Sequence, residues 1–439
     1  MNSLAVALAT DSAATVFLGR NSKVYNSADK LFMLSKRHPI GVMVYNNASL
    51  LGIPWETLLK MFRARLGRTE FGSVEEYAAE LLKFLDSNDH LFPKDVQYSS
   101  YLRMVETLYQ GINRGIEFRT LKEIRRGVDE PDREAIARDF IEKSHQQWLA
   151  GDDAERLDPK AGSSLAAQGS DKVQKAIDKS FPSLKLSHDD INRLRELAML
   201  VVNKKRILDE TRSGLVVAGF GGNEYFPAMH TYELGEVYLG RLKYHHLLTK
   251  KIDRETPSVI QPFAQSDMVD TFLGGISPAF KTRIISEFVS LVAQFPETII
   301  DEITDLSVKK REKWKNVMRP LAGALAQELV VELEKYRLRK HIGPVEQAIT
   351  NLPKNELAHV ASSLVNLNSF QKRMSVEQET VGGPVDVAVI TKGDGFVWIE
   401  RKHYFRPELN HQFFRNYGEG AEDEGERYDS KEKEGNEQS

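Results

Sequence analysis

An aspartate and a lysine border short apolar runs near the start of the chain. Asp11 follows the apolar residues 4–9, and Lys30 opens the run 30–34. An ammonium group at the start of an apolar run loses hydration, which lowers its pKa and makes a nearby carboxylate useful as a partner. The structural alternative is that Asp11 is a turn residue after a strand and that Lys30 is a surface lysine. These residue types alone leave both interpretations open.

Strands must position these two residues, and the front of the chain has the pattern of strands. Residues 4–9, 30–34 and 40–45 are apolar runs of strand length, and Pro39 stands where a hairpin connection would end. We expect the strands 4–9 and 40–45 to lie side by side in a central sheet. That pairing would bring one carboxylate and one ammonium group to a shared cleft.

Helical patterns follow this strand region. Apolar residues recur at helical spacing over 55–66, and Ser73 with Glu76 has the spacing of a capping box. Most of 99–210 also has a helical pattern, in which Ser187 starts a strong helix. The pattern is helical again from residue 257 to about residue 370.

Strand patterns return between and after these helices. We expect strands at 214–220, 233–242, 385–391 and 395–402, the last two joined by a hairpin turn at 392–394. Groups of strands that alternate with groups of helices predict an α+β fold rather than a series of βαβ units.

Three segments, taken in order, resemble a known family. VALATDSAAT (6–15) is an apolar strand with a turn that contains Asp11, and residues 23–48 place Lys30 before an apolar strand. The third segment joins GLVVAGFGG (214–222) to a glycine pair and hairpin at 381–395. In this order they resemble the proteasome β-subunit and its bacterial relatives, a branch of the N-terminal nucleophile (Ntn) hydrolases.

The resemblance implies a fold and an activity. The fold would be a four-layer αββα sandwich over residues 1–416, with helical insertions at about 100–185 and 257–340. The activity would be hydrolysis of an amide or peptide bond by an N-terminal threonine or serine, whose own amine helps as the base. By position, Asp11 and Lys30 match the family's aspartate and lysine, and a backbone amide in the turn at Asn46 would bind the oxyanion. The partners implied are a peptide or protein substrate and further copies of the chain, since the family stacks into rings.

The sequence departs from this family at three places, one of which is Val381 before the glycine pair, where a serine is common. Only ten residues precede Asp11, so the strand that carries the nucleophile is missing from this stretch. Asn46 stands where the family commonly has glycine, although asparagine tolerates the left-handed conformation better than most residues. Three alternatives stay open: a threonine or serine peptidase with a further strand upstream, a catalytically inactive binding or scaffold protein on the same fold, and a small-molecule amidase.

The amino-acid composition argues against several kinds of partner and site. The chain has 60 basic and 63 acidic residues, which argues against a nucleic-acid partner. It contains no cysteine, which excludes disulfides and a cysteine nucleophile, and its histidines lack the spacing of a metal site, so we expect no metal and no cofactor. Because no apolar run could cross a bilayer and the N-terminus lacks a basic region, we expect a cytoplasmic protein with no membrane partner.

Three further segments have simpler interpretations. Residues 417–439 hold nine acidic and three basic residues, so we expect a disordered acidic tail. The basic segment 309–315 is interpreted as a solvated helix face rather than a nucleic-acid contact. The glycine-rich residues 219–222 lack the lysine and hydroxyl group of a phosphate-binding loop, which favours a turn at the end of a strand.

Overall fold

The computed structural model describes residues 1–412 apart from 19, 20, 26, 87, 89, 305, 375–381 and 404. The predicted acidic tail 417–439 lies outside the described residues. The chain divides into two compact units. We call the first the sheet unit, formed by Ala28–Lys251, Ile390–Val397 and the described residues from His403 onward. The second, the arm unit, is formed by Met1–Ser27, Ile252–Val389 and Trp398–Lys402.

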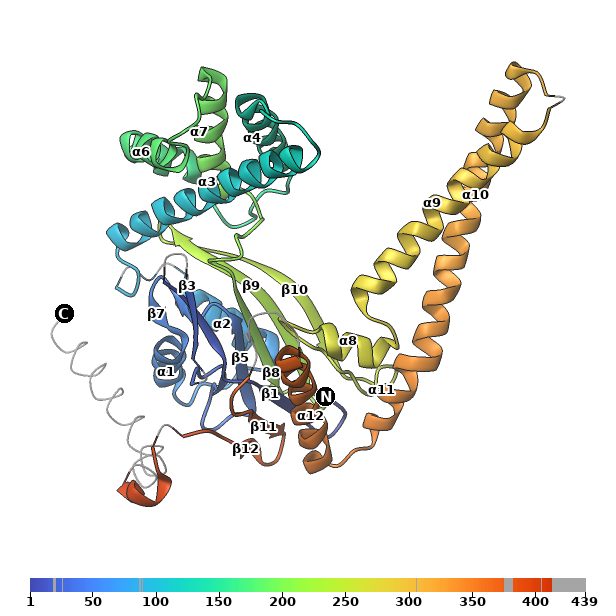
Figure 1. The fold of residues 1–439 in the computed structure, drawn as a ribbon. Helices are drawn as coiled ribbons and strands as arrows, with labels where there is room; N and C mark the ends of the chain where they lie inside the picture. The colour runs from blue at the N-terminus through green and yellow to red at the C-terminus, as the bar shows by residue number, and fades with distance from the viewer. Residues whose placement is uncertain are drawn as a thin grey trace. The chain divides into compact units, whose positions relative to one another are not determined.

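A five-stranded antiparallel sheet forms the centre of the sheet unit (Figure 1). Its strand order is β10–β9–β8–β5–β4, and β5 pairs with β8 from Ile40 opposite Gly219 to Asn46 opposite Ser213. The strands are β4 (Leu31–Met33), β5 (Ile40–Asn46), β8 (Ser213–Gly219), β9 (Ala228–Tyr238) and β10 (Arg241–Lys251). The prediction of one strand over 233–242 is wrong, because a turn with positive φ at Leu239 and Gly240 divides that run between β9 and β10.

Two amphipathic helices pack on this sheet. α1 (Trp55–Leu66) follows the short hairpin of β6 (Ser49–Leu50) and β7 (Ile53–Pro54), and α2 (Val74–Leu85) follows α1. Both helices bury their apolar faces against β5, β8 and β9 in one hydrophobic cluster. The Ser73 hydroxyl accepts the Glu76 amide at the start of α2, as the capping pattern predicts.

Five further helices form a second core in the sheet unit. They are α3 (Lys94–Arg125), α4 (Arg133–Leu149), α5 (Ala161–Gln168), α6 (Ser170–Ser180) and α7 (His188–Asn203). Ser187 caps α7 at the predicted start of this helix, and the structure adds a complete capping box with Asp190. Tyr238, at the end of β9, is fully buried among these helices, so one strand of the sheet contributes to both cores.

The tip of a C-terminal hairpin also packs on the five-stranded sheet. Ile390 and Phe396 lie so close to Gly41 that a Cβ atom there would meet them at 2.7 and 2.9 Å. Between them, the Lys392 ammonium group donates to the backbone carbonyl groups of Gly221 and Gly222 at 3.1 and 2.9 Å. The amides of Gly221 and Gly222 are also used inside the fold, by the Glu224 carboxylate and the Phe71 carbonyl oxygen, so this segment is a turn at the end of β8.

A three-stranded sheet of order β1–β11–β12 runs through the arm unit, and the hairpin of its last two strands continues into the sheet unit. Its strands are β1 (Val6–Thr10), β11 (Asp386–Thr391) and β12 (Gly395–Glu400). The helix α12 (Lys354–Met374) packs on β1 and β11 through a cluster that includes Ala5 and Leu357. A two-stranded hairpin of β2 (Ala14–Leu18) and β3 (Asn21–Tyr25), which the sequence patterns did not predict, follows β1.

The expectation that strands 4–9 and 40–45 lie side by side is wrong. β1 pairs with β11, whereas β5 lies between β4 and β8. Because both edges of β5 are hydrogen-bonded to its own neighbours, no edge is left for β1.

Helices make up the rest of the arm unit. They are α8 (Asp267–Gly274), α9 (Pro278–Glu302), α10 (Val308–Arg337), the π-helical turn η1 (Leu338–Ile342) and α11 (Gly343–Thr350). α9 and α10 run antiparallel as a long helical hairpin, which we call the arm (yellow and orange in Figure 1). A short 3₁₀ turn, η2 (Pro407–Leu409), belongs to the sheet unit. Mixed helices and antiparallel sheets confirm the α+β class at this coarse level.

Candidate functional site

Asp11 lies in the turn after β1, where two backbone amides hold its carboxylate. Oδ2 accepts hydrogen bonds from the amides of Ala13 and Gly382, both at 3.1 Å. The neighbouring Ser12 hydroxyl donates to the Pro384 carbonyl oxygen at 2.6 Å. Because β1 pairs with β11, the turn after one strand meets the glycine turn before the other. The sequence patterns singled out both turns but did not predict their contact.

Lys30 and Asn46 lie at the same end of the β4–β5 pair. The carbonyl oxygen of Lys30 accepts the amide of Val44 at 2.8 Å, and Asn46 follows two residues later at the end of β5. Asn46 has φ of +67°, so the asparagine adopts the left-handed conformation that a glycine would otherwise supply. These two predicted residues are therefore brought together by the register of one strand pair.

The predicted pair of Asp11 with Lys30 stays a prediction. Asp11 belongs to the arm unit, whereas Lys30 and Asn46 belong to the sheet unit. Within the asparagine turn, the Asn47 amide donates to the Arg212 carbonyl oxygen at 3.2 Å. The Asn47 amide is thus already used inside the fold, and an oxyanion would need another donor.

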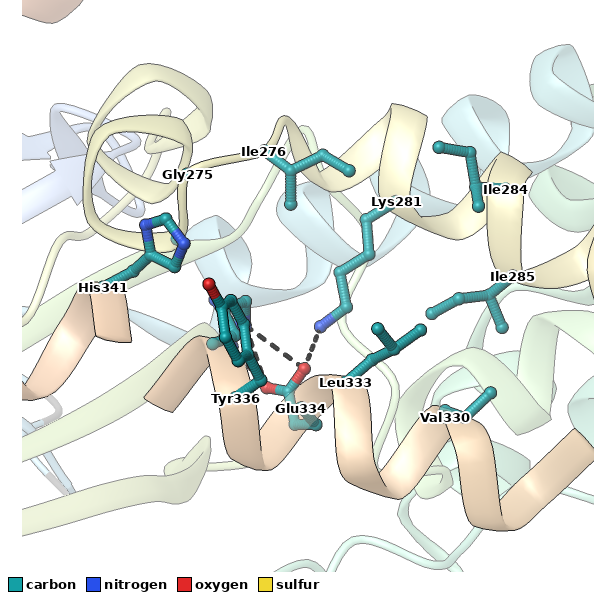
Figure 2. A pocket seen from close by; sticks show the side chains of 12 residues that line it. Gly275, Ile276, Lys281, Ile284, Ile285, Val330, Leu333, Glu334, Tyr336 and His341 are labelled. Carbon is teal, nitrogen blue, oxygen red and sulfur yellow. Dashed lines mark hydrogen bonds and ion pairs between the residues drawn. The ribbon is translucent and has the colours of Figure 1, made fainter. Parts of the chain in front are cut away.

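A cavity of about 210 Å³ lies at the base of the arm, between the end of α8, the start of α9 and the end of α10 (Figure 2). Five of its twelve lining residues have branched apolar side chains. They are Ile276, Ile284, Ile285, Val330 and Leu333. Figure 2 shows the side chains of Ile284, Ile285 and Val330 gathered at one end and those of Tyr336, Glu334 and His341 toward the other, so the cavity has an apolar part and a polar part.

An ion network occupies the polar part of this cavity. The Lys281 ammonium group donates to Glu334 Oε2 at 2.5 Å, and the Arg337 Nε atom donates to Glu334 Oε1 at 3.1 Å. Hydrogen bonds from Arg337 and then from Lys281 lower the pKa of the Glu334 carboxyl to about 2. At neutral pH one carboxylate therefore faces two cations, and the network keeps an excess of positive charge and of hydrogen-bond donors.

Two glycines at the end of α8 make room for the polar side chains. A Cβ atom on Gly274 would lie 2.7 Å from the Arg337 Nη1 atom, and one on Gly275 would lie 2.7 Å from the His341 Nδ1 atom. Gly275 also has φ of +72°, which favours glycine. Glycine at these positions lets the guanidinium and imidazole groups approach the backbone closely.

The sequence patterns missed this cavity. The helical periodicity of its walls was visible, but apolar positions at helical spacing are most simply core residues. The glycine pair 274–275 between two helical patterns was the available signal, because adjacent glycines permit close approach of other groups. The sequence does not show which side chains approach these glycines, because Arg337 of α10 and His341 of η1 lie some 60 positions further along the chain.

In comparisons with known proteins, no family model, no curated protein and no solved structure matches the chain. Within the described residues, no group of three or more His, Asp or Glu side chains could hold a metal ion. None of the helices that the structure describes is both long enough and apolar enough to cross a membrane.

Proposed function

We propose that this chain has the αββα architecture of the Ntn hydrolases and that it works as a ligand-binding protein on that fold. Support for the architecture comes from the order of strands and helices and from the hairpin tip at Ile390 and Phe396, which packs on Gly41 of β5. A hairpin tip on one face of a central sheet is compatible with the proposed architecture.

The cavity at the base of the arm is the observation that carries the binding function. It is concave and mostly apolar, with a few convergent polar groups, which is the usual composition of a ligand site. At about 210 Å³ it is smaller than the roughly 300–1,000 Å³ of pockets for drug-sized ligands. A short ligand therefore fits it better than a long one.

The charges of the cavity define the ligand class. Lys281 and Arg337 supply two positive charges against the single negative charge of Glu334. The donors that Glu334 does not use favour a ligand group that accepts hydrogen bonds and carries negative charge. We therefore propose a short apolar ligand with a carboxylate head group.

Titration calorimetry of the full chain with three eight-carbon probes tests this proposal. We expect octanoate to bind most tightly, octanol more weakly and octylammonium least, because only the first combines an apolar chain with a negative acceptor. Ile285→Trp fills the apolar part and should abolish octanoate binding, whereas Ser290→Trp, on the exposed side of the same helix, should not. Equal binding of all three probes, or no binding at all, would overturn the proposal.

Amide hydrolysis is the second candidate, favoured by the left-handed conformation of Asn46 beside Lys30. The test is cleavage of fluorogenic peptides by the full chain. Hydrolysis that Lys30→Ala abolishes and that the exposed-lysine control Lys83→Ala retains would establish this candidate. No cleavage, or cleavage that survives Lys30→Ala, would remove it.

A further inference from the structure

The arm leaves most of its apolar residues in solvent. Within α9 and α10, only Ile300, Ala322 and Ala326 are buried among the described residues. Leu291 and Phe295 of α9 are 66 % and 61 % exposed, and Leu321 and Leu325 of α10 are 60 % and 64 % exposed. Helices of 25 and 30 residues with so little buried surface gain little stability from their own contact. We therefore expect another surface to cover the exposed apolar residues of α9 and α10.

The exposed apolar residues of α10 form one stripe. Trp314, Val317, Leu321 and Leu325 follow one another at spacings of three and four residues, which places them on one side of a helix. The side that faces α9 is a different one, marked by the buried Ala322 and Ala326 and by the ion pair of Arg319 with Glu297 at 2.6 Å. The stripe is thus free of the contact between α9 and α10.

A second stripe runs along α9 through Ile284, Leu291, Phe295 and Ile299. Each helix of the arm therefore exposes its own apolar stripe.

The α10 stripe continues into a basic residue at its N-terminal end and an acidic residue at its C-terminal end. Lys310 lies eleven residues before Leu321, and Glu332 lies eleven residues after it. Trp314 and Glu328 are likewise seven residues to either side of Leu321, and Val317 and Leu325 are four residues to either side. The pattern is symmetric about Leu321 in position and complementary in charge.

We propose that the arm docks on the arm of a second copy of this chain, with the two α10 helices antiparallel and a twofold axis at Leu321. In this register Lys310 of each copy faces Glu332 of the other, and Val317 faces Leu325. Trp314 faces Glu328, so the indole N–H group gains a carboxylate acceptor. Only an antiparallel second copy makes all these pairs at once, because a twofold axis brings each residue opposite its symmetric position.

The chemistry of the pairs also argues against other registers. A parallel arrangement would place Lys310 opposite Lys310 and Glu332 opposite Glu332, and like charges at such positions disfavour association. Antiparallel pairing converts both repulsions into attractions. This inference is independent of the proposed ligand site, because none of the paired residues of α10 lines the cavity.

Charge reversal in the full chain, followed by sedimentation equilibrium, tests the register. We expect the wild-type chain to be a dimer, and Lys310→Glu and Glu332→Lys each to raise its dissociation constant about tenfold. The double variant should recover dimerisation, because the pairs are rebuilt with opposite polarity. Leu321→Glu, which places two carboxylates on the axis, should give a monomer.

Cysteine cross-linking provides a second measurement that does not depend on affinity. The chain has no cysteine of its own, so Leu321→Cys would place a single thiol next to its symmetric copy. We expect it to form a disulfide-linked dimer under mild oxidation. The control Glu312→Cys, an exposed position on the opposite side of α10, should not. A monomeric wild-type chain, a double charge variant that stays dissociated, or equal cross-linking of both cysteines would overturn the proposal.

Discussion

One buried carboxyl group makes the free energy of unfolding depend on pH. Glu236 of β9 is 6 % exposed and lies beside Ser100 and Arg103 of α3. Burial raises the pKa of its carboxyl from 4.5 to about 7, against the weaker opposing effects of Ser100 and Arg103. The native chain therefore holds a proton at this site that the unfolded chain releases.

The sign of the pH effect follows from this raised pKa. The stabilisation is fully present below pH 4.5 and is lost as pH rises to about 7, where the native carboxyl ionises too. The difference between the two pKa values is worth roughly 3 kcal/mol in the free energy of unfolding. We expect Glu236→Gln to remove this dependence, because the amide stays neutral at every pH.

Urea unfolding at pH 5 and pH 8 measures the effect. The wild-type chain should lose more stability between these pH values than Glu236→Gln does. Glu117→Gln changes an exposed carboxylate of α3 and should behave like the wild type. Identical pH differences in all three proteins would contradict the assignment.

At the scale of elements, the contact of β5 with the C-terminal hairpin depends on the absence of one side chain. Gly41 is the point where Ile390 and Phe396 reach the strand. A methyl group there would lie 2.7 Å from the Ile390 Cδ1 atom, well inside van der Waals contact. The side chains of Ile390 and Phe396, or the strands that carry them, must therefore shift if the residue becomes larger.

We expect Gly41→Ala to lower the free energy of unfolding by about 1–3 kcal/mol through overpacking. Adding Phe396→Leu should recover part of the loss, because the smaller side chain gives room for the methyl group. Gly323→Ala is the matched control. Its Cβ atom would meet nothing within 4 Å, so helix propensity should make it neutral or stabilising. Denaturant unfolding of the wild type, these variants and Phe396→Leu alone checks the prediction, and additive effects of the two changes would contradict it.

At the scale of the whole molecule, the proposed dimer combines an apolar face with two symmetric ion pairs. Exposed pairs contribute roughly 0.2–1 kcal/mol each and are screened by salt, because the Debye length falls from about 10 Å at 0.1 M to about 3 Å at 1 M. The apolar contacts of Leu321 and its neighbours do not weaken in the same way. Salt should therefore reduce the affinity without abolishing the dimer.

We expect the dissociation constant of the dimer to rise about two- to tenfold between low and high salt. Sedimentation equilibrium at several sodium chloride concentrations measures this change. A variant with Lys310→Gln and Glu332→Gln should bind more weakly at low salt and show a smaller salt dependence. An unchanged salt dependence in that variant would show that the pairs do not form.

Local patterns in the sequence determined the elements with the strongest periodicity. The helix at 55–66, the capped start of α7 at Ser187 and the hairpin turn at 392–394 were all predictable, because each depends on residues a few positions apart. The left-handed Asn46 was also within reach, because the preference of asparagine for that conformation is local. The division of residues 233–242 between two strands was missed, because the turn at Leu239 and Gly240 has no strong signal within an apolar run.

Only the tertiary structure decided which elements meet. β1 pairs with β11, more than 370 residues further along the chain, and a strand pattern does not name its partner. The cavity at the arm base likewise depends on three helices converging around Gly274 and Gly275. The sequence alone determined that α9 and α10 are helices with apolar positions. Which of those positions stay exposed depends on the line along which the two helices pack, and that is a property of the folded chain.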